Sequence, residues 1–174
     1  MITTSDPAVD QRARLLRSHA MRVAYTHEEV GFNFRMTDIH AAIGLAQLSR
    51  LDELNARRAD NAAFYDVAFA GASVRRPTLH PAARSAWHQY TLLVPREHRD
   101  ILVARLRTRG VGVGVYYPIP VHRQPAYRNI GGRDHHPIAE AAAERVLSIP
   151  VHPGVRAVDR AYVAAQVQCA LAEL

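Results

Sequence analysis

The sequence of 174 residues contains no lysine, because all 22 residues counted as lysine or arginine are arginine. Arginine cannot supply the uncharged side-chain amine that reacts with a carbonyl compound, since its guanidinium group stays protonated. Cysteine is nearly absent as well. The one cysteine, Cys169, excludes an internal disulfide framework and suits a reducing compartment, so we expect a cytoplasmic protein.

Long apolar runs are also missing. No stretch approaches the ~20 apolar residues that a membrane-spanning helix needs, and no charged-then-apolar leader opens the sequence. We therefore expect neither a membrane partner nor a signal peptide. The net charge of +6 permits binding of anionic ligands, but the arginines are spread along the chain and accompany no nucleic-acid-binding motif. We expect no nucleic-acid partner.

Several common site motifs are absent. The ten histidines match no metal-ligand spacing such as HExxH, so we expect no metal site. The sequence has no GxSxG segment of the kind that carries a nucleophilic serine. Gly112 and Gly114 partly match a dinucleotide-binding loop, but Tyr117 stands where the third glycine of GxGxxG belongs, and no helical pattern follows.

A polar loop and the helical pattern after it, residues 31–58, carry most of the functional information. Thr37 suits the N-cap position, because its hydroxyl can accept a hydrogen bond from a first-turn amide, and Asp38 places a negative charge where the helix dipole favours one. Asn33 and Arg35 precede this helix and offer neutral and cationic donors, a combination suited to an anion such as phosphate. The alternative is that Asn33 only shapes a turn and Arg35 is a solvated surface charge.

The apolar pattern after Thr37 predicts a long helix that continues to about Ala70, where Gly71 is suited to end it. A break near residues 52–55 is compatible with the pattern. A helix of this length suits an element that joins domains and contributes to a dimer contact, or else one that packs on its own domain. Its apolar side, residues 39–54, predicts association into a homodimer or larger species if it stays uncovered.

The remaining sequence mixes helical and strand patterns. It predicts strands at residues 87–94, 111–117 and 148–151 with helices on one face, which indicates an α+β fold. We divide the chain into a helical segment of residues 1–70 and an α+β domain of residues 71–174. Further helices are expected at residues 7–18, 98–109, from Pro137 onward and at 158–174, with a loop or hairpin at 19–30.

Three long motifs resemble those of one known family. The first, Gly31-Phe-Asn-Phe-Arg-Met-Thr-Asp-Ile-His, is similar to its GYNYRM-type segment. The second, Tyr116-Tyr-Pro-Ile-Pro-Val-His-Arg-Gln-Pro-Ala-Tyr, is similar to its HYPxPxHxQPAY segment. The third runs from Ala139-Glu-Ala-Ala-Ala-Glu to Ile-Pro-Val-His-Pro. In this order they resemble the C-terminal half of the pyridoxal-phosphate-dependent sugar aminotransferases of the DegT/DnrJ/StrS type.

This resemblance implies the C-terminal small domain of a fold-type I aminotransferase that uses pyridoxal 5′-phosphate, with a long N-terminal helical segment. It implies transfer of an amino group, usually from glutamate, to a keto-sugar attached to a nucleotide. The family's catalytic lysine, the carboxylate partner of the pyridine nitrogen and the ring-stacking aromatic belong to the half that is not matched. We therefore assign no catalytic residue here, and expect the chain alone to be inactive and not to retain the cofactor.

The resemblance also implies a cofactor-phosphate contact. Asn33 corresponds to the amide that reaches across a dimer interface to the phosphate of the other subunit, and Arg35 is expected as a second anion contact. The implied partners are a second copy of the chain or a complementary N-terminal half. The competing interpretation is an inactive remnant that serves as a dimerisation or partner-binding module.

The expected nucleotide-sugar contacts come from two other segments. Tyr116, Tyr117 and His122 are expected to line the nucleotide-sugar end of the cleft, and His88 resembles a strand residue of the family near the substrate. Tyr116 stands where histidine is usual in the family. A packed turn fixed by the neighbouring prolines is the alternative interpretation for Tyr117 and His122.

Overall fold

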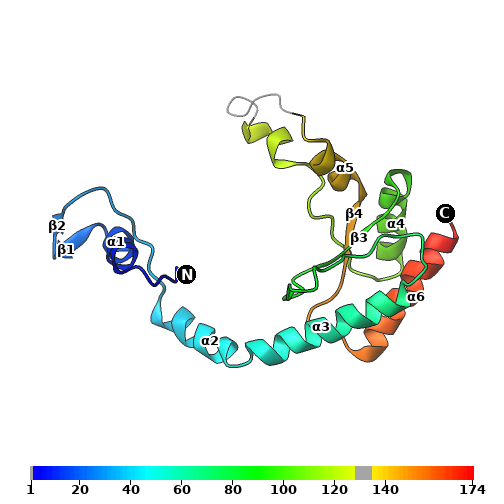
Figure 1. The fold of residues 1–174 in the computed structure, drawn as a ribbon, viewed down its shortest axis with the longest axis horizontal. Coiled ribbons are helices and arrows are strands. Elements are labelled where there is room, and N and C mark those ends of the chain that lie inside the picture. Colours follow the sequence, from blue (N-terminus) through cyan, green and yellow to red (C-terminus); the bar gives the residue numbers. More distant parts are fainter. Residues whose placement is uncertain (1, 128–134) are drawn as a thin grey trace. The chain divides into compact units, whose positions relative to one another are not determined.

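A computed structural model describes residues 2–127 and 135–174. The chain forms two compact units, residues 1–50 and residues 51–174, each described by itself below (Figure 1). The first unit contains α1 (Pro7–Arg17), β1 (Met21–Val23), β2 (Thr26–His27) and α2 (Asp38–Leu48). The second contains α3 (Leu51–Ala68), β3 (Tyr90–Leu93), α4 (Arg96–Thr108), the 3₁₀ turns η1 (Val121–Arg123) and η2 (Pro125–Tyr127), α5 (Pro137–Arg145), β4 (Val146–Ile149) and α6 (Ala157–Ala172).

The first unit is a capped helix followed by a hairpin. The Asp6 carboxylate accepts a hydrogen bond from Ala8 N at 2.8 Å, and Pro7 occupies the first turn, as the sequence predicts for a helix start. The strands β1 and β2 pair antiparallel, which confirms the hairpin alternative for residues 19–30. Gly31 passes close to the chain before β1, since a Cβ at this position would lie 2.2 Å from Ala20 N. Only glycine permits that approach.

Helix α2 begins as predicted but ends earlier. The Thr37 hydroxyl accepts from His40 N at 3.3 Å, which confirms it as the N-cap. The predicted long helix is interrupted after Leu48 and not at residues 52–55. At the interruption the Ser49 hydroxyl donates to Ala46 O at 2.9 Å, and Arg50 N donates to Gln47 O at 3.1 Å. These bonds tighten the last turn and end the regular helical ladder.

The division of the chain after residue 70 stays a prediction. The contacts group helix α3 with the second unit, which begins at Leu51. The reason is that α3 and the turn after it bury Ala62, Tyr65 and Phe69 in the core of the second unit. Helix α3 nevertheless ends near the predicted place, and Gly71 there has a φ of +81°, a conformation that glycine adopts without strain.

The sheet of the second unit differs from the predicted one. Strands β3 and β4 pair antiparallel, with Tyr90 opposite Ile149 and Leu93 opposite Val146 (Figure 1). The predicted strand at residues 111–117 is wrong, because only Gly114 forms a bridge, with one hydrogen bond each way to Ser148 at 3.1 and 2.8 Å. The two glycines in this segment favour pairing weakly.

The core of the second unit lies between the sheet and helices α3, α4 and α6. Two buried tyrosines in this core each donate a hydrogen bond from the hydroxyl group. The Tyr65 hydroxyl donates to Pro150 O at 2.9 Å, and burial raises the pKa of Tyr65 to about 12. The Tyr90 hydroxyl donates to Asp66 Oδ1 at 2.7 Å, and burial and this bond raise the pKa of Tyr90. Both hydroxyls therefore stay neutral and serve the fold.

No helix among the described residues is both long and apolar enough to cross a membrane. Helix α2 is nevertheless mostly apolar, and none of its residues is buried. Its large apolar side chains are exposed by 57 to 74% in Ile39, Ile43, Leu45 and Leu48. An apolar helix that lacks a covered face is unusual for a monomer in water.

Candidate functional site

The loop before α2 presents a pair of polar side chains. The backbone of this loop is held by hydrogen bonds to the end of α1, from Phe32 N to Leu16 O at 2.7 Å and from Phe34 N to Arg17 O at 3.0 Å. On this frame Arg35 Nε donates to the Asn33 side-chain oxygen at 2.8 Å, and both residues are exposed.

The hydrogen bond between Arg35 and Asn33 leaves several N–H groups of these side chains available to a ligand. Because the Asn33 oxygen accepts from Arg35, the parts of the two side chains that remain for a ligand are the amide NH₂ and the guanidinium NH₂ groups. Such groups match the oxygens of a phosphate. The donor set therefore fits the phosphate of the cofactor that the resemblance implies. It does not fit covalent attachment of that cofactor to a side chain, since the sequence has no lysine.

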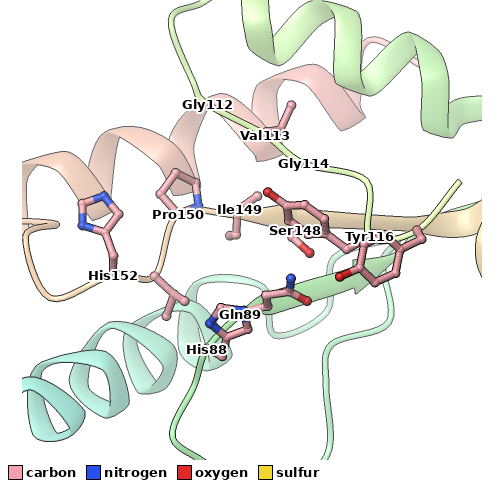
Figure 2. Close-up of a pocket in the computed structure, with 12 residues that line it drawn as sticks. His88, Gln89, Gly112, Val113, Gly114, Tyr116, Ser148, Ile149, Pro150 and His152 are labelled. Carbon is pink, nitrogen blue, oxygen red and sulfur yellow. The ribbon is translucent and has the colours of Figure 1, made fainter. Parts of the chain in front are cut away.

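A cavity of about 580 Å³ in the second unit, here called the His88 cavity, brings together three of the predicted site residues (Figure 2). His88, Tyr116 and Tyr117 line it. Its other polar lining comes from Gln89, Ser148 and His152. The described lining thus offers hydroxyl, amide and imidazole groups, without a carboxylate or guanidinium.

His88 is held by an unusual backbone, and does not lie in a strand as the sequence predicts. It precedes β3, and its neighbour Trp87 has a φ of +46°, a left-handed conformation that is strained for a bulky residue. Two contacts hold this conformation. Arg58 Nη1 donates to Trp87 O at 3.2 Å, and the Trp87 ring stacks on Tyr90 with a centroid distance of 5.7 Å. Sequence patterns do not reveal this geometry.

His122 lies in a second cavity, not in the first. This His122 cavity also measures about 580 Å³ and shares Tyr116 and Tyr117 with the His88 cavity. The rest of its lining is mostly apolar and comes from Ile119, Pro120, Val121, Gln124, Ala139, Ala142, Ala143 and Val146. The two tyrosines therefore line both cavities, of which the His88 cavity carries more polar side chains.

Glu140 is a site residue that the sequence reasoning missed. Its carboxylate accepts from His136 N at 3.2 Å, meets His122 Nε2 at 2.9 Å, and pairs with Arg123 at 2.8 Å. The hydrogen bond from His122 is the main reason why the pKa of Glu140 is lowered to about 2. Glu140 is the first glutamate of the third family motif, and its place in that motif was the only signal available.

We expect replacement of Glu140 to change the pH dependence of stability. Because its pKa is depressed in the folded chain, ionised Glu140 stabilises the fold above about pH 4.5, and this contribution is lost as the pH falls toward 2. Glu140→Gln should lower the urea midpoint of unfolding at pH 7. The difference in midpoint between Glu140→Gln and the unchanged chain should become smaller as the pH is lowered from 4.5 to 3. Urea titrations across this range measure it.

Glu144→Gln is the control, because Glu144 lies on the same helix and, among the described residues, pairs with exposed Arg96 at 3.1 Å. Surface pairs of this kind contribute little, so its midpoint should stay close to that of the unchanged chain. Equal midpoints for Glu140→Gln and the unchanged chain at pH 7 would contradict the role of Glu140.

Among residues 2–127 and 135–174, no group of three or more histidine, cysteine, aspartate or glutamate side chains is placed to hold a metal ion.

Comparisons with known proteins agree on one family. The model of the DegT/DnrJ/EryC1/StrS aminotransferase family matches residues 1–168. The erythromycin biosynthesis sensory transduction protein EryC1 of Saccharopolyspora erythraea is 39% identical over 87% of this chain and 42% of its own length. The dTDP-3-amino-3,4,6-trideoxy-alpha-D-glucose transaminase of Streptomyces venezuelae is 37% identical over 87% of this chain and 40% of its own length.

A solved structure gives the same result. The crystal structure of DesV from S. venezuelae superposes with a TM-score of 0.91 and 34% identity, over 97% of this chain and 46% of that chain. The chain thus spans somewhat less than half the length of the relatives that it matches. The match over residues 1–168 and the likeness in structure lead to the same conclusion: the chain belongs to the DegT/DnrJ/EryC1/StrS aminotransferase family.

Proposed function

We propose that the chain is the C-terminal portion of a pyridoxal-phosphate-dependent aminotransferase that acts on nucleotide-linked keto-sugars. The observation that carries this proposal is the family match over residues 1–168. Relatives named as transaminases of dTDP-linked and UDP-linked sugars support the substrate class. In this proposal residues 71–174 correspond to the small domain of a fold-type I enzyme, and residues 1–70 supply the helical segment and the phosphate loop.

Asn33 and Arg35 hold the cofactor phosphate in this proposal. Their NH₂ groups donate to the phosphate oxygens, while the bond from Arg35 Nε to the Asn33 oxygen at 2.8 Å keeps the asparagine amide in one orientation. When bound, pyridoxal 5′-phosphate supplies an electron sink that makes amino transfer possible. The chain's own contribution is to bind and orient its anionic end.

His88, Tyr116 and Tyr117 contact the sugar in this proposal, and His122 lies in the adjoining cavity. Phenol hydroxyls both donate and accept, and the faces of their rings pack against the C–H groups of a sugar. The polar lining of the His88 cavity suits the hydroxyl groups of a neutral sugar ring. Glu140 positions His122 through the hydrogen bond at 2.9 Å.

The amine that the reaction requires must come from another polypeptide segment, because this chain has no lysine. We propose that a complementary N-terminal half supplies it, and that the assembled enzyme forms a dimer in which Asn33 reaches the phosphate of the other subunit. The exposed apolar helix α2 supports association with a second copy or with that half.

Replacement of Asn33 tests the phosphate contact. In the assembly of this chain with the half that supplies the lysine, Asn33→Ala should weaken retention of pyridoxal 5′-phosphate by about 10- to 100-fold. The reason is that a hydrogen bond to a charged group contributes roughly 1.5–3 kcal/mol and each 1.4 kcal/mol is tenfold. Equilibrium dialysis measures the affinity.

Two controls make this result specific. Asn55→Ala, the same substitution in α3, should leave retention unchanged, and pyridoxal without its phosphate should bind Asn33→Ala and the unchanged assembly alike. An unchanged affinity of Asn33→Ala for pyridoxal 5′-phosphate rules out the proposed contact.

The second candidate function is a non-catalytic module for dimerisation or partner binding. The absence of lysine and the exposure of α2 favour it for the chain alone. The two candidates differ in what the neighbouring DNA encodes. The enzyme is supported if a neighbouring reading frame encodes the lysine-bearing half. Its product should then copurify with this chain and restore amino transfer to a nucleotide sugar.

A further inference from the structure

Tyr116 lies at the border of two cavities of different chemistry. It lines the His88 cavity, which carries imidazole, amide and hydroxyl groups, and the mostly apolar His122 cavity, together with Tyr117. Figure 2 shows Tyr116, Gly114 and Ser148 close together at one end of the His88 cavity. The position of the Tyr116 ring therefore decides whether one ligand can occupy both cavities.

The Tyr116 ring is packed directly against the backbone of Gly114. A Cβ added to Gly114 would lie 2.5 Å from both Cε2 and Cζ of Tyr116 and 2.6 Å from its hydroxyl oxygen. Atoms do not approach so closely, so any other residue at this position displaces the ring. The Gly114 backbone cannot yield easily, because it exchanges two hydrogen bonds with Ser148 at 3.1 and 2.8 Å.

Gly112 offers a comparison in the same segment. A Cβ added there would meet nothing within 4 Å. The two glycines share the same neighbours in sequence, since both stand between valines, and substitution by alanine changes the unfolded chain equally at both. The steric demand is thus specific to Gly114 and to the Tyr116 ring.

We propose that Gly114 is a positioning residue, and that the Tyr116 ring lying on it is a partition that sets how far a sugar ligand extends from the His88 cavity toward the His122 cavity. This inference rests on the proposed function in so far as the ligand is a nucleotide sugar. A compact sugar fits within the His88 cavity. A sugar with a bulky acetamido group needs the apolar space beyond the partition, which is lined by alanine and valine side chains.

The partition itself is tested without any ligand. In the full chain, NMR should show contacts between the Gly114 Hα protons and the Tyr116 ring protons, retained in Gly112→Ala. Gly114→Ala should lower the urea midpoint in the unchanged chain but not in a Tyr116→Ala background, because the clash needs the ring. Absent NMR contacts, or an equal loss in both backgrounds, overturn the positioning role.

The effect on specificity is tested with UDP-glucose and UDP-N-acetylglucosamine, two probes that differ only at the C2 substituent. The unchanged chain should prefer UDP-glucose. Tyr116→Ala should shift the ratio of the two dissociation constants about tenfold toward UDP-N-acetylglucosamine, since the acetamido methyl group then enters an apolar pocket, where one additional methylene is worth about 10- to 200-fold. Gly114→Ala should shift the ratio in the same direction and add nothing to Tyr116→Ala.

The outcomes separate the two proposals. Binding of both probes with a ratio that neither substitution changes overturns the partition and leaves the proposed function standing. Binding of neither probe removes the assignment of the cavity to a nucleotide sugar, while the NMR contacts and the unfolding cycle still decide whether Gly114 positions Tyr116.

Discussion

Borohydride reduction of the purified chain in the presence of pyridoxal 5′-phosphate should leave no pyridoxyl group on any internal side chain. A trapped adduct needs an uncharged amine that attacks the cofactor aldehyde, and the 22 cationic side chains other than histidine are all arginine. The chain's own amine is its α-amino group, with a reference pKa of ~7.7–8.0. Peptide mass mapping after reduction locates any adduct.

The same reasoning predicts no turnover. Amino transfer uses the lysine amine both to bond covalently to the cofactor aldehyde and to move a proton, and Arg35 can do neither although it can bind a phosphate. The purified chain should therefore not transaminate any nucleotide sugar. Arg84→Lys is the positive control for the mapping, because Arg84 is exposed and a lysine there should take up the label. A pyridoxyl group on an internal residue of the unchanged chain would show that the interpretation is wrong.

The starts of α1 and α2 and the ends of α3 and α4 could be predicted because the signals that set them are local, whereas the interruption after Leu48 was not predicted. Asp6 and Thr37 cap α1 and α2 through bonds to residues two or three positions away. Gly71 and Gly110 follow α3 and α4 with positive φ values, which glycine adopts more easily than other residues. A few consecutive residues contain all of this information.

The sheet could not be predicted in the same way, since its pairing is non-local. The pattern at residues 87–94 indicates a strand, but not that its neighbour is β4, residues 146–149. The alternation at 111–117 is equally regular, yet only Gly114 pairs. Which segment pairs depends on the packing of the helices against the sheet, and a strand pattern carries no record of that packing.

In the candidate site, too, local features could be predicted and non-local ones could not. The sequence places Asn33 and Arg35 two residues apart, and their hydrogen bond is a local consequence. It does not reveal that His88 and His122 line different cavities, or that Glu140 contacts His122, because these arrangements depend on how α5, β4 and the segment before η1 pack together. Chemistry-bearing residues were predictable, and their grouping was not.

Sedimentation of the purified chain at micromolar concentration should show a homodimer or a larger species and no stable monomer. Helix α2 exposes Ile39, Ile43, Leu45 and Leu48, and none of its residues is buried within the chain. The stacked rings of Phe32 and Phe34 add exposed apolar surface just before it. Contact with a second copy removes this surface from water, at roughly 25 cal/mol for each Å² buried.

Charges on α2 should reverse this association. The double substitution Leu45→Glu and Leu48→Glu should shift the chain to a monomer, because two carboxylates cannot enter an apolar contact without partners. Gln47→Glu adds a charge on the same helix without removing apolar surface, and should weaken association far less. A stable monomer for the unchanged chain refutes the prediction outright. If Leu45→Glu/Leu48→Glu associates as strongly as the unchanged chain, the contact between copies does not involve this part of α2.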